Sequence, residues 1–288
     1  MLKKKKNLKK KLFVIGLVIA LVTVLSGCGY STDPITKDSP GFWSHYIVFP
    51  LSWVIRWFAD AFGGNYAVGI IVVTIIIRLI IMPLMIKQLK SQKEMMKVQP
   101  LLKELQGKYA SKDNETKQKL QQETMRLYQE HNINPMMGCL PLIIQMPILI
   151  GFYQAISRTA EIKTDSFLWM TLGQPDPFYI LPIIAAITTF LSSKISMMGQ
   201  TQQNKTMAMM IYFMPVMILF MGITLPSALA LYWIIGNIFT VFQTLLINNP
   251  FKAKKLQQAE EAAKAEEARL KKKAEHMKAS KRGGKKRK

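Results

Sequence analysis

The sequence has few of the side chains that most catalytic and metal sites require. Its 3 histidines, His45, His131 and His276, are widely separated, and its only 2 cysteines are Cys28 and Cys139. No glycine-rich loop ending in Lys-Ser or Lys-Thr is present. This pattern indicates neither a metal centre nor a Ser-His nucleophile nor a phosphate-binding loop. We therefore expect a protein that is not an enzyme and that uses no metal or cofactor.

Acidic residues are also scarce, with 17 Asp and Glu against 39 Lys and Arg, while hydrophobic residues make up 50% of the chain. The net charge of +22 would by itself suit a nucleic-acid-binding protein. A soluble protein with this much apolar surface would, however, need a large core. Apolar helices that face lipid, with the charge held in loops, explain both features. We expect the lipid bilayer as partner, and no DNA.

The N-terminal residues resemble a lipoprotein signal peptide. Seven lysines lie between Lys3 and Lys11, and the apolar stretch from Leu12 to Leu25 is short for a spanning helix. It ends in Leu-Ser-Gly-Cys28, which resembles a lipobox. We predict cleavage after residue 27 and attachment of palmitate-type acyl chains at Cys28, outside the cell. An uncleaved signal anchor with an incidental cysteine is the alternative.

Five later segments are long and apolar enough to cross a bilayer core of about 30 Å. They are Tyr66–Leu84, Met136–Ile156, Phe178–Ile195, Met207–Ile223 and Ser227–Ile247. The sequence thus predicts an all-α membrane protein whose five-span core covers residues 65–248. The turn around Pro226 is short, so we expect the last two spans to form a tight antiparallel hairpin.

The positive charges predict the orientation of these spans. Loops 85–133 and 194–206 and the tail from residue 248 carry 27 Lys and Arg, whereas the loops on the other side of the mature chain carry 4. The positive-inside rule places the first set in the cytoplasm. Five spans that start outside also end inside. We predict a bacterial cytoplasmic membrane protein with a lipid-anchored N-terminus outside and a cytoplasmic C-terminus.

Three segments outside the spans have a distinct character. Residues 28–64 form the predicted external segment, in which the aromatic stretch Gly41–Phe62 predicts an amphipathic helix in the membrane interface; a sixth span is the alternative. Loop 85–133 predicts a cytoplasmic helical hairpin with arms at about Lys87–Gln106 and Glu115–Glu130. Residues 249–288 predict a basic cytoplasmic tail, partly helical and then disordered.

Arg78 is the main candidate functional residue because it lies well inside the first span. A charge at that depth costs about 2.5–3.5 kcal/mol, and no other span contains Asp or Glu. We interpret it as facing a hydrated cavity open to the cytoplasm; snorkelling to the cytoplasmic surface is the alternative. Thr74, Gln145 and Trp233 carry polar groups that we expect to line the same interior, although each singly also suits a helix–helix hydrogen bond.

These residues together resemble the YidC family of membrane protein insertases. The resemblance rests on Arg78, the basic hairpin that follows it, and the run Asn134-Pro-Met-Met-Gly-Cys-Leu-Pro141 before Gln145 and Pro147. The lipobox and the five-span core are similar to the Gram-positive members. The resemblance implies a hydrophilic groove, closed toward the outside and open to cytoplasm and lipid, which Arg78, Gln145 and Trp233 line. We add Thr74, one turn before Arg78 on the same helix face, to the predicted substrate contacts.

The resemblance also implies a function. We expect an insertase and chaperone that moves nascent membrane proteins into the cytoplasmic membrane, alone or with the Sec translocon. The inserted segment would leave sideways between the third and fifth spans. The basic tail would bind either the ribosome, whose RNA is a polyanion, or anionic lipid. A transporter or channel for an anionic solute is the alternative function; it predicts inverted repeats, and we find no internal repeat.

Overall fold

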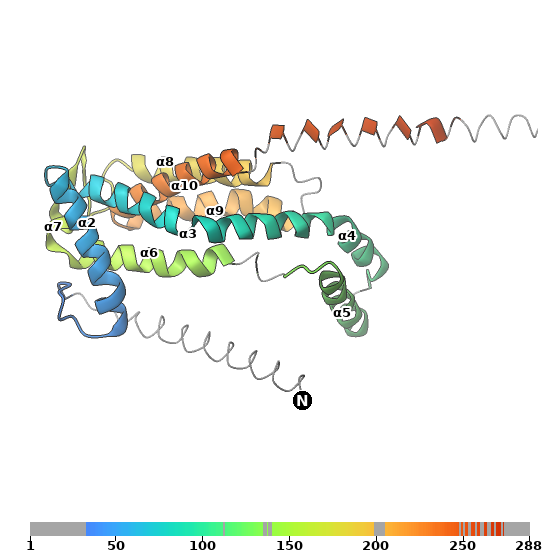
Figure 1. Cartoon of the computed structure of the whole chain (residues 1–288), viewed down its shortest axis with the longest axis horizontal. Coiled ribbons are helices and arrows are strands. Elements are labelled where there is room, and N and C mark those ends of the chain that lie inside the picture. Colours follow the sequence, from blue (N-terminus) through green and yellow to red (C-terminus); the bar gives the residue numbers. More distant parts are fainter. Residues whose placement is uncertain are drawn as a thin grey trace, which may run out of the picture.

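The computed structural model describes residues 33–273, apart from 112, 135, 136, 138, 139, 199–204, 248, 250 and several positions between 253 and 272. The predicted signal peptide with Cys28, half of the NPMMGCLP run and much of the basic tail lie outside the described residues. The elements are η1 (Ser44–Val48), α2 (Phe49–Ala61), α3 (Tyr66–Lys97), α4 (Gln99–Lys108), α5 (Asn114–Glu130), α6 (Leu140–Arg158), α7 (Ala160–Thr164), β1 (Ser166–Phe167), β2 (Met170–Thr171), α8 (Ile180–Met197), α9 (Lys205–Thr224) and α10 (Ser227–Ile247). The chain is therefore mostly helical, as predicted (Figure 1).

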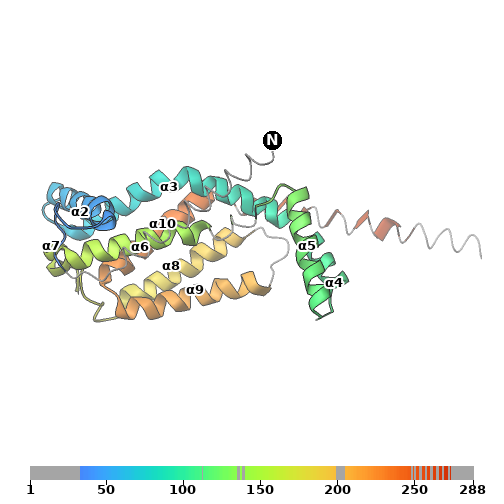
Figure 2. The same ribbon diagram turned by 90° about the horizontal axis from the view of Figure 1, so that it is seen from below.

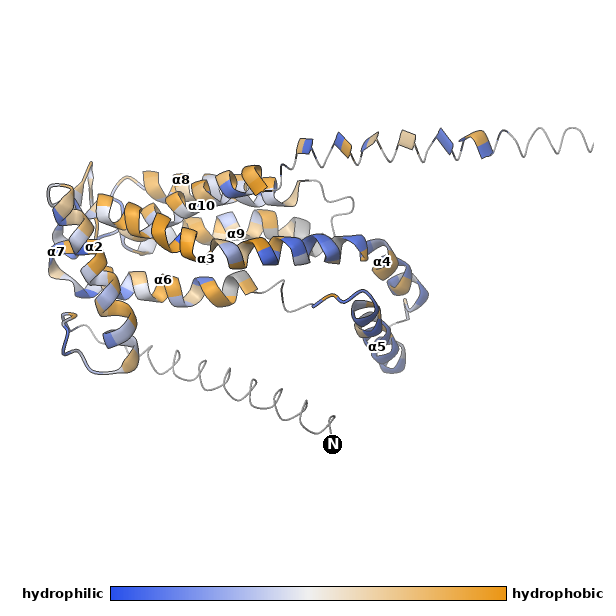
Figure 3. Ribbon diagram, in the orientation of Figure 1, coloured by the Kyte–Doolittle hydropathy of each residue, from blue (hydrophilic) through white to orange (hydrophobic). Residues whose placement is uncertain are grey.

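Helix α3 continues well beyond the predicted end of the first span at Leu84. Its 32 residues correspond to about 48 Å, more than the roughly 30 Å of a bilayer core. Figure 3 shows that α3 is apolar near α2 and hydrophilic toward α4. The residues after Leu84 are mostly Lys, Gln, Leu, Met and Glu, which favour a continuous helix. The predicted first arm of the hairpin, Lys87–Gln106, is therefore divided at Val98 between α3 and α4.

The long helices pack side by side in the order α3, α10, α8, α9 (Figure 2). The predicted antiparallel hairpin of the last two spans is wrong in one respect. A short turn does connect α9 to α10, but each packs mainly against α8 and they touch each other only sparsely. Gly222 on α9 contributes to the close packing on α8, since a Cβ on Gly222 would lie 3.0 Å from Pro182 Cβ. Because Gly222 has no side chain, α9 approaches α8 closely.

Three of the five predicted spans meet the length and hydropathy required of a membrane-crossing helix within the described residues. They are Tyr66–Met95, Ile180–Met197 and Ser227–Ile247. Helix α9 contributes a shorter apolar stretch, Ile211–Thr224. Helix α6 corresponds to the predicted second span and is 19 residues long. The number of five spans stays a prediction.

The segments 33–62 and 159–179, which we call the end cap, fold over one end of the helices (Figure 1). Helix α2 crosses α3 closely at Gly69, where a Cβ would lie 2.5 Å from Ile55 O. Asp176 is 1% exposed and accepts hydrogen bonds from Trp169 Nε1 and from the backbone N–H of Phe178 and Leu181. Helices α4 and α5 pack together at the opposite end of the molecule.

Candidate functional site around Arg78

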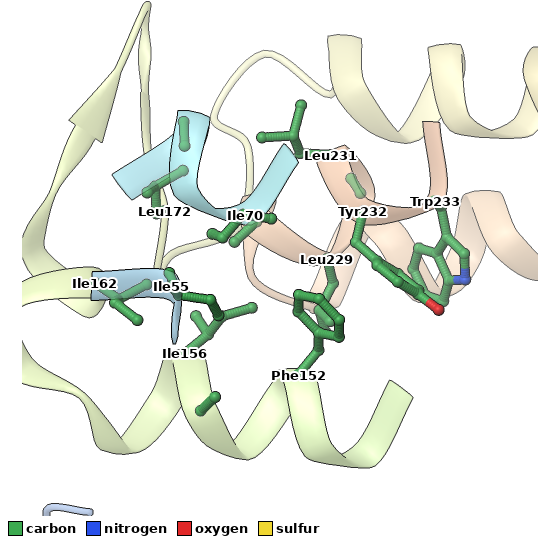
Figure 4. Close-up of a cluster of buried hydrophobic side chains, with 14 of the residues drawn as sticks. Ile55, Ile70, Phe152, Ile156, Ile162, Leu172, Leu229, Leu231, Tyr232 and Trp233 are labelled. Carbon is green, nitrogen blue, oxygen red and sulfur yellow. The ribbon is translucent and has the colours of Figure 1, made fainter. Parts of the chain in front are cut away.

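The buried hydrophobic cluster occupies only the half of the bundle next to the end cap. It includes Ile55, Ile70, Phe152 and residues 228–234 of α10 (Figure 4). Along α6 the exposed fraction falls from 49% at Ile143 to 0% at Phe152. The bundle is thus tightly packed at the cap end and more open toward α4 and α5.

Arg78 lies on α3 at the border of this cluster, and its side chain is half-buried. Its guanidinium packs against α10, where a Cβ on Gly236 would lie 2.5 Å from Nη2 and 3.2 Å from both Cζ and Nε. Among the described residues, no carboxylate forms an ion pair with Arg78 and no group hydrogen-bonds to it. A positive charge at this depth is therefore held without a counter-ion from the described part of the chain.

Gln145 reaches the same region from α6. Its side-chain Nε2 donates a hydrogen bond to the hydroxyl of Tyr232 at 2.6 Å. The Tyr232 ring also lies against Phe152, with 4.7 Å between the ring centroids, and Tyr232 lies about one turn before Gly236, the residue that Arg78 packs against. Tyr232 therefore links α6 to α10 beside the arginine, in a position that sequence reasoning did not assign to it.

Trp233 and Thr74 differ in whether their polar groups already have a hydrogen-bond partner. Trp233 is 7% exposed and lies next to Tyr232 at one side of the cluster (Figure 4); its indole N–H has no hydrogen-bond partner among the described residues. Thr74 is fully buried, and its hydroxyl donates to Ile70 O at 2.7 Å within α3. The hydroxyl of Thr74 is thus satisfied by its own helix, and contact with a substrate stays a prediction for both residues.

A second polar group, between α8 and α10, is separate from Arg78. Asn237 donates from Nδ2 to Thr189 Oγ1 at 2.8 Å and accepts at Oδ1 from Ser192 Oγ at 3.0 Å. These bonds join the third and fifth predicted spans, between which we expected the inserted segment to leave. That expectation is wrong for this conformation, because the two helices pack closely and are hydrogen-bonded at this point.

Among the long helices, α6 packs appreciably only against α10. Its other main contacts are with η1, α2 and α7, mostly through its buried C-terminal half, and it does not pack extensively against α3, α8 or α9 within the described residues. The sides of α6 that face α3 and α9 therefore both lack close helix–helix packing.

Comparisons with known proteins identify the family. A family model described as "60Kd inner membrane protein" matches residues 57–255. The chain is 82% identical over 287 residues to the "Membrane protein insertase YidC 2" of Listeria innocua, with 100% of both chains covered. It is 54% identical over 239 residues to the "Membrane protein insertase MisCA" of Bacillus subtilis, covering 82% of this chain and 92% of that protein. The chain belongs to the YidC family.

A solved structure supports this family assignment. It is described as "Active YidC insertase crystal structure with the first transmembrane domain resolved" and matches with a TM-score of 0.55 at 28% identity. The match covers 72% of this chain and 48% of that chain. This chain thus spans about half the length of the solved YidC chain, so the likeness concerns the shared half.

Two residues near Arg78 in this YidC family member escaped sequence reasoning. Tyr232 resembles an ordinary interfacial aromatic, and only its tertiary contacts with Gln145 and Phe152 reveal its place. Gly236 did leave a signal, since it is the only glycine in α10 and an isolated glycine within a helix often marks a close approach. The missing information was the partner, which comes from α3.

Proposed function

We propose that this chain inserts nascent membrane proteins into the cytoplasmic membrane, and that Arg78 attracts the polar, often acidic part of the incoming segment. The half-buried guanidinium without a carboxylate partner among the described residues carries the proposal. An unpaired arginine in hydrocarbon is costly, so it persists where water or a passing anionic group solvates it. The relatives named as membrane protein insertases support the same function.

The distribution of packing suggests how the polar part would travel. The buried cluster near the end cap would close the site toward the outside, whereas the more exposed half near α4 and α5 would admit water from the cytoplasm. The polar part of a substrate would then cross a shortened hydrocarbon path beside Arg78. The apolar part would leave toward lipid beside α6, whose sides toward α3 and α9 lack close helix–helix packing. Apolar transfer and the membrane potential would drive the step.

The end cap suits the outer membrane interface. Trp53 and Trp57 on α2 are each 55% exposed, while Ser52, Ile55 and Ala59 on the opposite face are buried. Exposed indoles beside a buried face are typical of a helix at headgroup depth. The proposed arrangement therefore has five spans, the lipid-anchored N-terminus outside, and α4, α5 and the basic tail in the cytoplasm.

The cytoplasmic elements would meet the partners. Helix α5 carries exposed ion pairs such as Lys119 with Glu115 and Arg126 with Glu130, so its surface is charged and accessible. We include the ribosome and the Sec translocon as partners and a chaperone role as part of the proposal. To distinguish ribosome binding by the tail from lipid binding, we would measure binding to ribosomes and to anionic vesicles, each for the chain with and without residues 249–288.

The test is insertion into proteoliposomes of a single-span substrate with an acidic external end, and of a matched substrate with Asn and Gln in place of the acids. Arg78→Ala should reduce insertion of the acidic substrate about tenfold or more, since a hydrogen bond to a charged group contributes about 1.5–3 kcal/mol. Arg78→Lys should retain most activity.

Arg56→Ala is the matched control. It removes another arginine whose 3.3 Å ion pair with Glu161 lies at the surface, where such pairs contribute little. No insertion by the wild-type chain above empty liposomes would contradict the function. Full insertion of the acidic substrate by Arg78→Ala would contradict the role of the charge, and solute flux without insertion would favour a transporter.

A further inference from the structure

The contact between Arg78 and α10 has a consequence for the glycine beneath it. All three of the nearest heavy atoms that a Cβ on Gly236 would meet belong to Arg78, namely Nη2 at 2.5 Å and Cζ and Nε at 3.2 Å. Real side chains essentially never approach to 2.5 Å. The guanidinium is rigid and planar, so a methyl group at residue 236 would displace the whole head group.

Gly236 differs in this respect from the glycines that serve helix packing. A Cβ on Gly69 would meet the backbone oxygen of Ile55, and one on Gly222 would meet the ring of Pro182. Those neighbours are fixed parts of another helix. Gly236 instead faces the end of a flexible side chain, which can move without separating α3 from α10. Glycine is unfavourable within a helix, so its presence at residue 236 needs a reason. Close packing of α10 on another helix backbone is not that reason, because the nearest atoms belong to the Arg78 side chain.

We infer that Gly236 is a positioning residue, which sets the depth and orientation of the Arg78 guanidinium by leaving room for it against the α10 backbone. The inference rests on the proposed function insofar as Arg78 acts on substrates. In this position the charge packs against α10 about one helical turn after Tyr232, whose hydroxyl accepts from Gln145. A side chain at residue 236 would move the charge away from α10 and from this hydroxyl.

The predicted effect of Gly236→Ala is specific. The purified variant should keep its helicity and unfold close to the wild-type temperature, because only the tip of Arg78 must move. Insertion of the acidic-ended substrate should fall about threefold to tenfold, the size expected for coupled neighbouring residues. Insertion of the matched neutral substrate should change little. Gly151→Ala is the control, since its Cβ would meet Ile47 and Leu51 at ordinary distances of 3.5 and 3.6 Å.

A double-mutant cycle with Arg78→Lys separates positioning from structure. Lysine has no planar head group, so Gly236→Ala should cost much less in the Arg78→Lys background than in the wild-type chain. Equal effects in both backgrounds would overturn the inference, because they would show that the methyl group acts through the helix and not through Arg78. If Gly236→Ala does not fold, the double variant with Arg78→Lys decides. A double variant that also fails to fold would overturn the inference, and one that folds would support it.

A second measurement does not depend on insertion. Phenylglyoxal modifies exposed guanidinium groups, and mass spectrometry of the peptides gives its rate at Arg78 with Arg56 of the same molecule as reference. We expect Gly236→Ala to change the relative rate at Arg78 and Gly151→Ala to leave it unchanged. An unchanged rate in Gly236→Ala would overturn the inference. A wild-type chain that inserts nothing would contradict the proposed function, while this rate would still decide the positioning.

Discussion

The hydrogen bond between Gln145 and Tyr232 should measurably stabilise the attachment of α6 to α10. Helix α6 has few neighbours among the long helices, and this 2.6 Å bond lies between its more open half and the buried half. Tyr232→Phe removes the hydroxyl and keeps the ring contact with Phe152. Side-chain hydrogen bonds within membranes contribute about 0.6 kcal/mol on average and up to about 1.7 kcal/mol. We expect Tyr232→Phe to destabilise the protein by this amount.

The assay is equilibrium unfolding in mixed micelles with increasing SDS, followed by tryptophan fluorescence, to which Trp233 beside Tyr232 should contribute. Gln145→Leu and the double variant complete a cycle. The double variant should lose less stability than the two single variants lose together. The difference, which is the coupling energy of the bond, should be about 0.6–1.7 kcal/mol. A coupling below about 0.5 kcal/mol, the usual error of additivity, would refute the reasoning. Tyr232→Ala, which also removes the ring, should cost about 3–5 kcal/mol.

Three further predictions concern the rest of the fold. Asp176→Ala removes the acceptor of three hydrogen bonds in a buried site, so the unfolding temperature should drop clearly, and an unchanged value would contradict the assigned cap. Gly69→Ala should cost about 1–3 kcal/mol by overpacking, because its Cβ would meet the Ile55 backbone oxygen; unchanged SDS resistance would count against the close crossing. The Ser111 hydroxyl and the Thr116 N–H hold the pKa of Asp113 well below its usual range. The ionised carboxylate therefore stabilises the start of α5 at any pH above the unfolded pKa of Asp113. This contribution is lost only as the pH falls through the lower pKa of the folded state. Hydrogen exchange at the Thr116 N–H should thus stay slow from pH 7 to pH 5, and it should accelerate in Asp113→Ala.

The sequence by itself determined the helical class and the family, and it predicted Arg78 as the main candidate functional residue. Long apolar stretches predict helices because backbone groups in hydrocarbon must form their hydrogen bonds within the segment. A charged residue within such a stretch is easily recognised. The polar character of Gln145 was equally visible. It was noticed because a polar group in an apolar segment needs a partner, which is a local property of the residue type.

Only the tertiary structure decided which partners these residues have. Gln145 pairs with Tyr232, whereas Asn237 pairs with Thr189 and Ser192 on α8, so the polar side chains between the helices form two separate groups. Hydropathy likewise does not predict the side-by-side order of the helices. Helix α9 directly precedes α10 in the chain, yet both pack mainly on α8. Lipid-facing and helix-facing apolar residues have the same composition, because lipid tails are as apolar as a helix surface. The neighbouring helices are therefore selected by complementary shape, at positions such as Gly69 and Gly222, which act only when the opposing helix is present.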